Sequence, residues 1–130
     1  MKVLLCERNF KGHRKIYMEW LTNVPRIEFY IIAPENIGVA EDHYIRCETC
    51  DNLKTVNSYL KWMNQIKTVV KKNNVDIVHI LDGDSIMRYF GLGFGCLGTN
   101  KVVITYHHFF EGFLRKISYR MMCGRKNRIC

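Results

Sequence analysis

Two adjacent histidines end one of the most apolar runs of the chain, and histidines in that position can do chemistry. The run is Lys101–His107, and His108 follows it. An imidazole hydrogen-bonds hydroxyl and phosphate groups and exchanges a proton near neutral pH. Successive side chains of a strand point to opposite faces, so only one of the two is expected to face a ligand. We predict His107 as the catalytic, substrate-contacting residue; the alternative is one histidine packed on the sheet and one on the surface.

A basic loop with one glycine follows the first apolar run. It contains Lys11, Gly12 and His13, with Arg8 and Arg14 nearby, and it precedes a predicted helix. A helix amino terminus offers free N–H groups and the positive end of the helix dipole. Glycine lets the backbone come close to a ligand. The loop therefore predicts a phosphate or carboxylate site; the alternative is an ordinary helix entry with solvated bases.

A third group of polar residues follows the apolar run Asp76–Leu81. Asp82 lies closest to the end of that run and is a candidate to accept a hydrogen bond from a substrate hydroxyl. Asp84 is better placed to cap the next helix, because its carboxylate can accept from free backbone N–H groups.

Two further motifs carry less weight. The segment Gly93–Gly98 matches G-x-G-x-x-G, but it follows a helix and precedes a strand, the reverse of the dinucleotide fingerprint. Cys47 and Cys50 form a C-x-x-C after a short strand and before a helix, as in thioredoxin. No second pair of ligands stands at a suitable spacing for zinc, so no metal is expected. The six cysteines are expected to be mostly reduced, with Cys6 and Cys96 in the core.

The elements that must position these residues alternate between strands and helices. Apolar runs predict strands at 2–6, 27–33, 43–47, 76–81 and 101–107, and helical spacing predicts helices at 13–24, 53–73, 84–97 and 110–122. Strands that are buried on both faces and joined by helices form parallel sheets. The order predicts an α/β fold, a Rossmann-like doubly wound parallel sheet of order 3-2-1-4-5 with helices on both faces. The topological switch then lies between the first and fourth strands.

The spacing of apolar residues also predicts which side of each helix is apolar. In the helix over 13–24, the residues Ile16, Trp20, Leu21 and Val24 share one face. In the helix over 53–73, the apolar stripe is Leu53, Val56, Leu60, Met63, Ile66 and Val70.

Length and charge narrow the class of protein. The chain has 130 residues, enough for one domain, and its net charge is +8. Residues 113–130 hold six Lys and Arg with no acid, so most of the positive charge lies there. That end can meet anionic lipid, nucleic acid or water. No apolar run is long enough for a membrane span or a signal peptide, which predicts a cytoplasmic protein.

Taken together, these features resemble the amino-terminal domain of a GT-B glycosyltransferase, most like family 4. The similar features are the first strand leading to Gly12, the long helix ahead of Asp76-Ile-Val-His79, and Val102–His107 closing on a histidine. Residues 1–124 would be the acceptor-side domain and residues 125–130 the start of a truncated continuation. Two departures are the single glycine in the loop and the missing donor-binding domain.

The resemblance implies transfer of a sugar, of the hexosyltransferase type, from a nucleotide-sugar donor. The acceptor would be a polysaccharide or a lipid-linked molecule, with no bound cofactor or metal. Gly12 would approach the donor phosphates and His107 the transferred sugar, with Lys11, His13 and Asp82 as further contacts. The chain alone would lack turnover and would need the missing domain or a partner chain. The basic helix 110–122 could make a peripheral membrane contact, but the favoured alternative is that its apolar face covers the sheet in the full-length enzyme. Nucleic acid is not an expected partner.

Two alternatives stay open at this point. One is a stand-alone Rossmann-like binding module that partners a separate catalytic chain. The other is a redox protein that uses Cys47 and Cys50.

Overall fold

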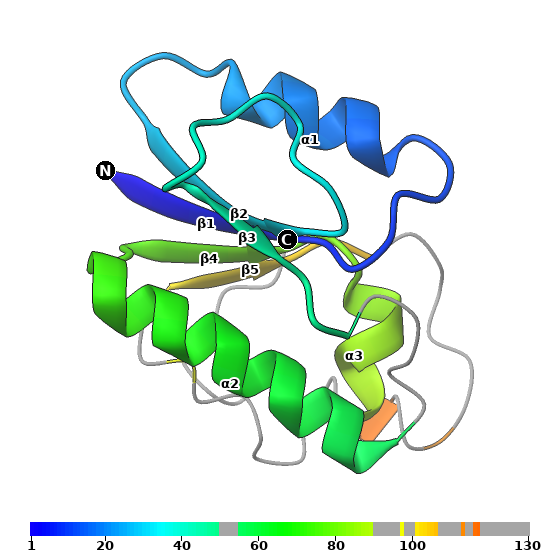
Figure 1. Cartoon of the computed structure of the whole chain (residues 1–130). Coiled ribbons are helices and arrows are strands. Elements are labelled where there is room, and N and C mark those ends of the chain that lie inside the picture. Colours follow the sequence, from blue (N-terminus) through cyan, green and yellow to red (C-terminus); the bar gives the residue numbers. More distant parts are fainter. Residues whose placement is uncertain (50–54, 90–96, 98–100, 107–112, 114–115, 118–130) are drawn as a thin grey trace.

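Five parallel strands organise the chain (Figure 1). The computed structural model describes residues 1–49, 55–89, 97, 101–106, 113 and 116–117. The strands are β1 (Lys2–Cys6), β2 (Glu28–Ala33), β3 (Tyr44–Arg46), β4 (Ile77–Ile80) and β5 (Val102–Ile104). They lie in the order β3-β2-β1-β4-β5, and every neighbouring pair is parallel. The predicted fold class and strand order are confirmed.

Helices cover both faces of this sheet (Figure 1). Helix α1 (Arg14–Thr22) lies on one face, and α2 (Val56–Asn73) and α3 (Gly83–Tyr89) lie on the other. Alternate residues of β1 serve the two layers, since Leu4 and Cys6 pack with α2 while Val3 and Leu5 pack on the side of α1. The central strand is therefore buried on both sides.

Helix α2 is the longest helix among the described residues, and local signals set its ends. The Thr55 hydroxyl accepts a hydrogen bond from the Ser58 N–H (3.2 Å) at its start. Asn74 ends it in the left-handed conformation (φ 53°), close to the predicted end. Its buried residues are Tyr59, Trp62, Met63, Ile66, Val69 and Val70.

The predicted apolar stripe of α2 is therefore only partly right. Met63, Ile66 and Val70 are buried, but Val56 and Leu60 are exposed. The large rings of Tyr59 and Trp62 carry more apolar area than those aliphatic side chains, so burying them turns the helix away from the predicted stripe.

The predicted apolar face of α1 does not face the core. Ile16, Trp20 and Val24 are exposed, and the buried residue of this helix is Met18. Leu21, which was grouped with the exposed residues, is partly buried against the core on this side of the sheet. Apolar residues occur on both sides of α1, so periodicity alone could not choose between them.

Other predictions differ at element ends or fall on residues that are not described. Helix α3 begins at Gly83, so Asp84 lies within its first turn and not at a cap. Cys6 is buried as predicted. The predictions on His107, Cys50, 93–96 and 118–130 lie outside the described residues.

Candidate functional site at the switch between β1 and β4

The carboxyl ends of β1, β4 and β5 are tied together just beyond the strands. The Leu81 N–H donates to the Cys6 carbonyl (3.0 Å), and the Gly83 N–H donates to the Thr105 carbonyl (3.0 Å). These bonds continue the parallel register by one or two residues. The residues that directly follow β1 and β4 are therefore held side by side, where the strand order reverses and α/β sheets bind ligands.

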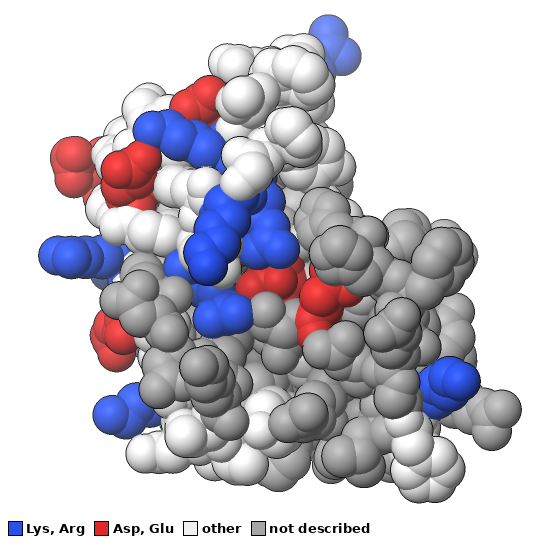
Figure 2. Space-filling model, turned by 90° about the vertical axis from the view of Figure 1, so that its right-hand side faces the viewer, with Lys and Arg blue, Asp and Glu red and all other residues white. Residues whose placement is uncertain are grey.

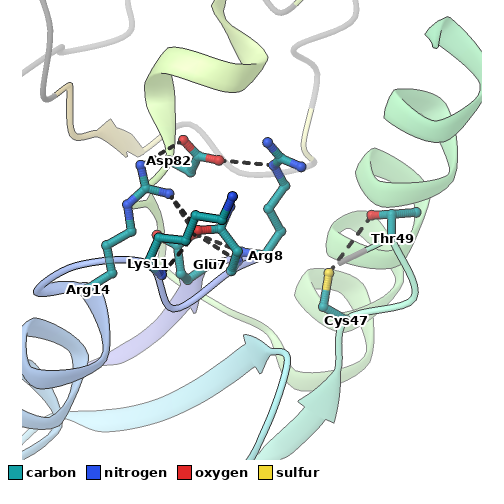
Figure 3. Close-up of polar contacts among 8 residues, drawn as sticks. Glu7, Arg8, Lys11, Arg14, Cys47, Thr49 and Asp82 are labelled. Carbon is teal, nitrogen blue, oxygen red and sulfur yellow. Dashed lines mark hydrogen bonds and ion pairs between the residues drawn. The ribbon is translucent and has the colours of Figure 1, made fainter. Parts of the chain in front are cut away.

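Asp82, which follows β4, contacts the loop that follows β1. Its side chain is almost fully buried and pairs with two guanidinium groups (Figure 3). Arg8 Nε lies 2.9 Å from Oδ2, and Arg14 Nη2 lies 3.3 Å from Oδ1. The structure thus brings the loop after β1 against Asp82, as the predicted topology requires. Both Asp82 oxygens face protein donors.

Glu7 is the second buried carboxyl group of the site, and the sequence analysis did not single it out. Its Oε1 accepts hydrogen bonds from the backbone N–H groups of Arg8 (2.9 Å) and Asn9 (3.2 Å), and from Arg14 Nη1 (3.4 Å). Its Oε2 is buried and has no hydrogen-bond partner within the described part of the chain. One oxygen is well satisfied and the other is not.

This environment raises the pKa of Glu7 to about 7. Burial is the main cause, because removal from water disfavours the charged carboxylate, and the nearby Asp82 charge adds to it. The backbone N–H of Asn9 and the Arg14 guanidinium act in the opposite direction. Glu7 can therefore exchange a proton near neutral pH.

The predicted loop residues lie beside these carboxyl groups. Gly12 has a φ of 66°, the left-handed region that favours glycine, and no described atom lies within 4 Å of where a Cβ would be. The Lys11 side chain extends over the cluster in Figure 3. His13 is exposed at the start of α1 and makes no side-chain capping bond.

Figure 2 shows Lys and Arg side chains gathered beside acidic side chains near the middle of this face of the molecule. Arg8, Lys11 and Arg14 against Glu7 and Asp82 give 3 − 2 = +1 when Glu7 is ionised, and +2 when it is protonated. A group of this charge, with two fork-shaped guanidinium donors and an open backbone at Gly12, suits a phosphate or carboxylate ligand.

A partly buried histidine lies further along the same edge. His79 Nε2 is 2.8 Å from the Thr105 hydroxyl, a contact that joins β4 to the residues after β5. Burial lowers the pKa of His79, so the neutral ring is favoured. This histidine supports the edge of the sheet.

Other candidate chemistry receives less support. Cys47 is buried, with its Sγ 3.8 Å from the Thr49 hydroxyl, whereas an attacking thiol must be accessible. Among the described residues no group of three or more His, Cys, Asp or Glu could hold a metal ion. Nor is any helix in the described ranges long and apolar enough to cross a membrane.

Comparison of the chain with protein-family models, with curated proteins and with solved structures gives no match.

Proposed function

We propose that this domain is the acceptor-side part of a glycosyltransferase that takes its sugar from a nucleotide-sugar donor. The transfer, of the hexosyltransferase type, would be to a polysaccharide or a lipid-linked acceptor, with a second domain or chain binding the rest of the donor. The observation that carries the proposal is the cluster of Arg8, Lys11 and Arg14 around Gly12 at the switch point.

The strand order supports this assignment. A parallel 3-2-1-4-5 sheet places ligands beyond the strands at the β1/β4 switch, where the cluster lies. A nucleotide-sugar carries a diphosphate, and diphosphates are held by cationic side chains and backbone N–H groups. The resemblance to the amino-terminal domain of GT-B enzymes points in the same direction.

The residues would then act as follows. Lys11 and the backbone at Gly12 meet the phosphates, since that side of the loop is open. Asp82 and Glu7 hold the two guanidinium groups in place from below. His107 would contact the transferred sugar and His13 would be a further substrate contact, whereas Asp82 would act through the two arginines that occupy both of its oxygens.

Phosphate binding can be tested on the chain itself. A nucleoside diphosphate is titrated into ¹⁵N-labelled protein while the Gly12 amide resonance is followed. We expect a saturable shift of that resonance, and roughly fivefold weaker binding in Lys11→Ala, because about 1 kcal/mol of attraction is lost. Lys61→Ala on α2 is the matched control and should bind like the wild type.

Two results would contradict the phosphate site. One is an unmoved Gly12 resonance at millimolar ligand. The other is an equal loss of affinity in both lysine variants, which would indicate an effect of net charge alone.

Sugar transfer is tested with a donor-binding domain supplied. His107→Ala should then strongly reduce transfer without changing the thermal midpoint. Unchanged turnover in that variant would remove His107 from the proposal.

A further inference from the structure

The outward side of α1 is apolar, which is unusual for a surface helix. Ile16 (49% exposed), Tyr17 (40%) and Trp20 (70%) lie on α1 at spacings of one and four residues from the first, and Val24 (42%) follows just beyond the end of the helix. Those spacings place the three helical residues, Ile16, Tyr17 and Trp20, on one side of α1. We call this set the α1 stripe. No described helix or strand lies over it in Figure 1.

The α1 stripe is more than the scattered apolar exposure found on any protein. Single exposed apolar residues are normal, but contiguous apolar patches mark interaction sites. The core contact of α1 is made by its other side, where Met18 is fully buried. The α1 stripe is therefore not needed to pack α1 against the core of this domain.

Positive charge lies at both ends of the α1 stripe. Lys11 is exposed at its amino end and Arg26 at its carboxyl end. The nearest acid on α1 is Glu19, which is only partly exposed and lies close enough to Lys15 to interact with it. The outward side of α1 thus combines apolar and aromatic side chains with cationic ends.

We infer that the α1 stripe and its flanking bases form a contact surface for an anionic lipid membrane. Tryptophan and tyrosine favour the membrane–water interface, and an apolar helix face with cationic flanks binds anionic bilayers. The net charge of +8 disfavours a second copy as the occupant, because two such copies repel each other. The inference is independent of the proposed sugar transfer.

Vesicle binding gives a direct test, and the two tryptophans make it specific. Trp20 is exposed and Trp62 is buried, so a change in emission on adding vesicles reports Trp20. The chain is mixed with vesicles of phosphatidylglycerol and phosphatidylcholine, and with vesicles of phosphatidylcholine alone. We expect a blue shift and co-sedimentation with the anionic vesicles only, weakening as salt is added.

Matched double variants locate the surface. Ile16→Ser with Trp20→Ser should weaken co-sedimentation at least about tenfold, because most of the inserted apolar area is lost. Val56→Ser with Leu60→Ser removes two exposed apolar residues (45% and 38%) from α2 and should bind like the wild type. Circular dichroism checks that both variants are folded.

Three results would overturn the inference. The wild type could fail to bind anionic vesicles, or the two double variants could bind equally well. The third is concentration-dependent self-association, measured by sedimentation, that the Ile16/Trp20 variant abolishes; that result would assign the α1 stripe to a second copy of the chain.

Discussion

The protonation state of Glu7 sets the net charge of the whole site. Glu7 follows β1 directly and is buried between the loop it begins and Asp82, with one oxygen well bonded and the other unpartnered within the described ranges. A carboxyl group that pairs with a guanidinium, as Glu7 does with Arg14, would ordinarily be expected to stay ionised. Here the effect of burial is larger than the effect of the nearby positive charge, and the pKa of Glu7 rises to about 7. The charge of the cluster therefore depends on pH within the physiological range.

The raised pKa of Glu7 predicts a pH-dependent stability that Glu7→Gln removes. The folded chain binds the proton more tightly than the unfolded chain, whose Glu7 pKa is near 4.5. This contribution is complete below that value and is lost as the pH rises through about 7. Relative to Glu7→Gln, the wild type should lose up to about 3 kcal/mol of unfolding free energy between acidic and mildly alkaline pH.

Urea unfolding of both proteins at about pH 5 and about pH 8 measures this difference, since all other titrating groups cancel in the comparison. Parallel stability–pH curves would mean that Glu7 titrates at its ordinary value.

The protonation of Glu7 should also change the affinity for an anionic ligand. An anion at Lys11 and Gly12 is repelled by an ionised Glu7, so affinity for a nucleotide-sugar should fall as the pH rises past about 7. The phosphates of such a donor do not titrate in that range, which isolates the protein's contribution. Calorimetric titration of the wild type and Glu7→Gln checks this; we expect a flat profile for the variant, and a flat profile for both would contradict the coupling.

At the scale of elements, the junction between β4 and α3 depends on a residue without a side chain. A Cβ on Gly83 would lie 2.6 Å from Ile104 Cγ2, 2.6 Å from the Thr105 carbonyl oxygen and 2.8 Å from Tyr106 Cε1. The close approach allows the Gly83 N–H to bond Thr105 and hold β5 in register. Asp82 is positioned by the same junction.

Gly83→Ala should therefore lower the unfolding free energy by about 1–3 kcal/mol, because backbone and packed side chains must both shift. Gly12→Ala is the useful comparison, since it has open space and only the cost of its positive φ, about 1 kcal/mol. Urea unfolding of the two variants separates steric overlap from backbone strain. An unchanged midpoint for Gly83→Ala would show that α3 can move away at little cost.

Prediction from sequence succeeded best where topology decides the outcome. The strand order follows from chain direction and crossover handedness, and it correctly brought the loop after β1 to Asp82. The rotation of α1 and the burial of Glu7 were missed. Both depend on which of several apolar or polar side chains is buried in the core. The spacing of residues along the sequence does not predict which of them is buried. Arg8 and Arg14 were identified as positive charges, but their shared partner depends on tertiary contacts.

At the scale of the whole molecule, burial is greatest at the centre of the sheet. β1 pairs with β2 and β4 and is covered by both layers, while β3 is a three-residue edge strand with residues partly exposed. Native-state hydrogen exchange should therefore show β1 amides opening only with global unfolding, and β3 amides opening locally at lower free energy. Equal protection in β1 and β3 would indicate that the sheet opens as one unit.

The central place of β1 has a consequence for how the chain reaches its fold. The strand made first by the ribosome pairs on one side with β4, and the Asp76 N–H closes that pairing on the Lys2 carbonyl, 74 residues away. A growing chain can join β1 to β2 early, but the other side of β1 stays open until β4 has emerged. Contacts so far apart in sequence slow folding. Synthesis therefore passes through a stage in which the central strand, with its buried apolar side chains, has one unpaired side, and this is the stage at which the chain would most need a chaperone.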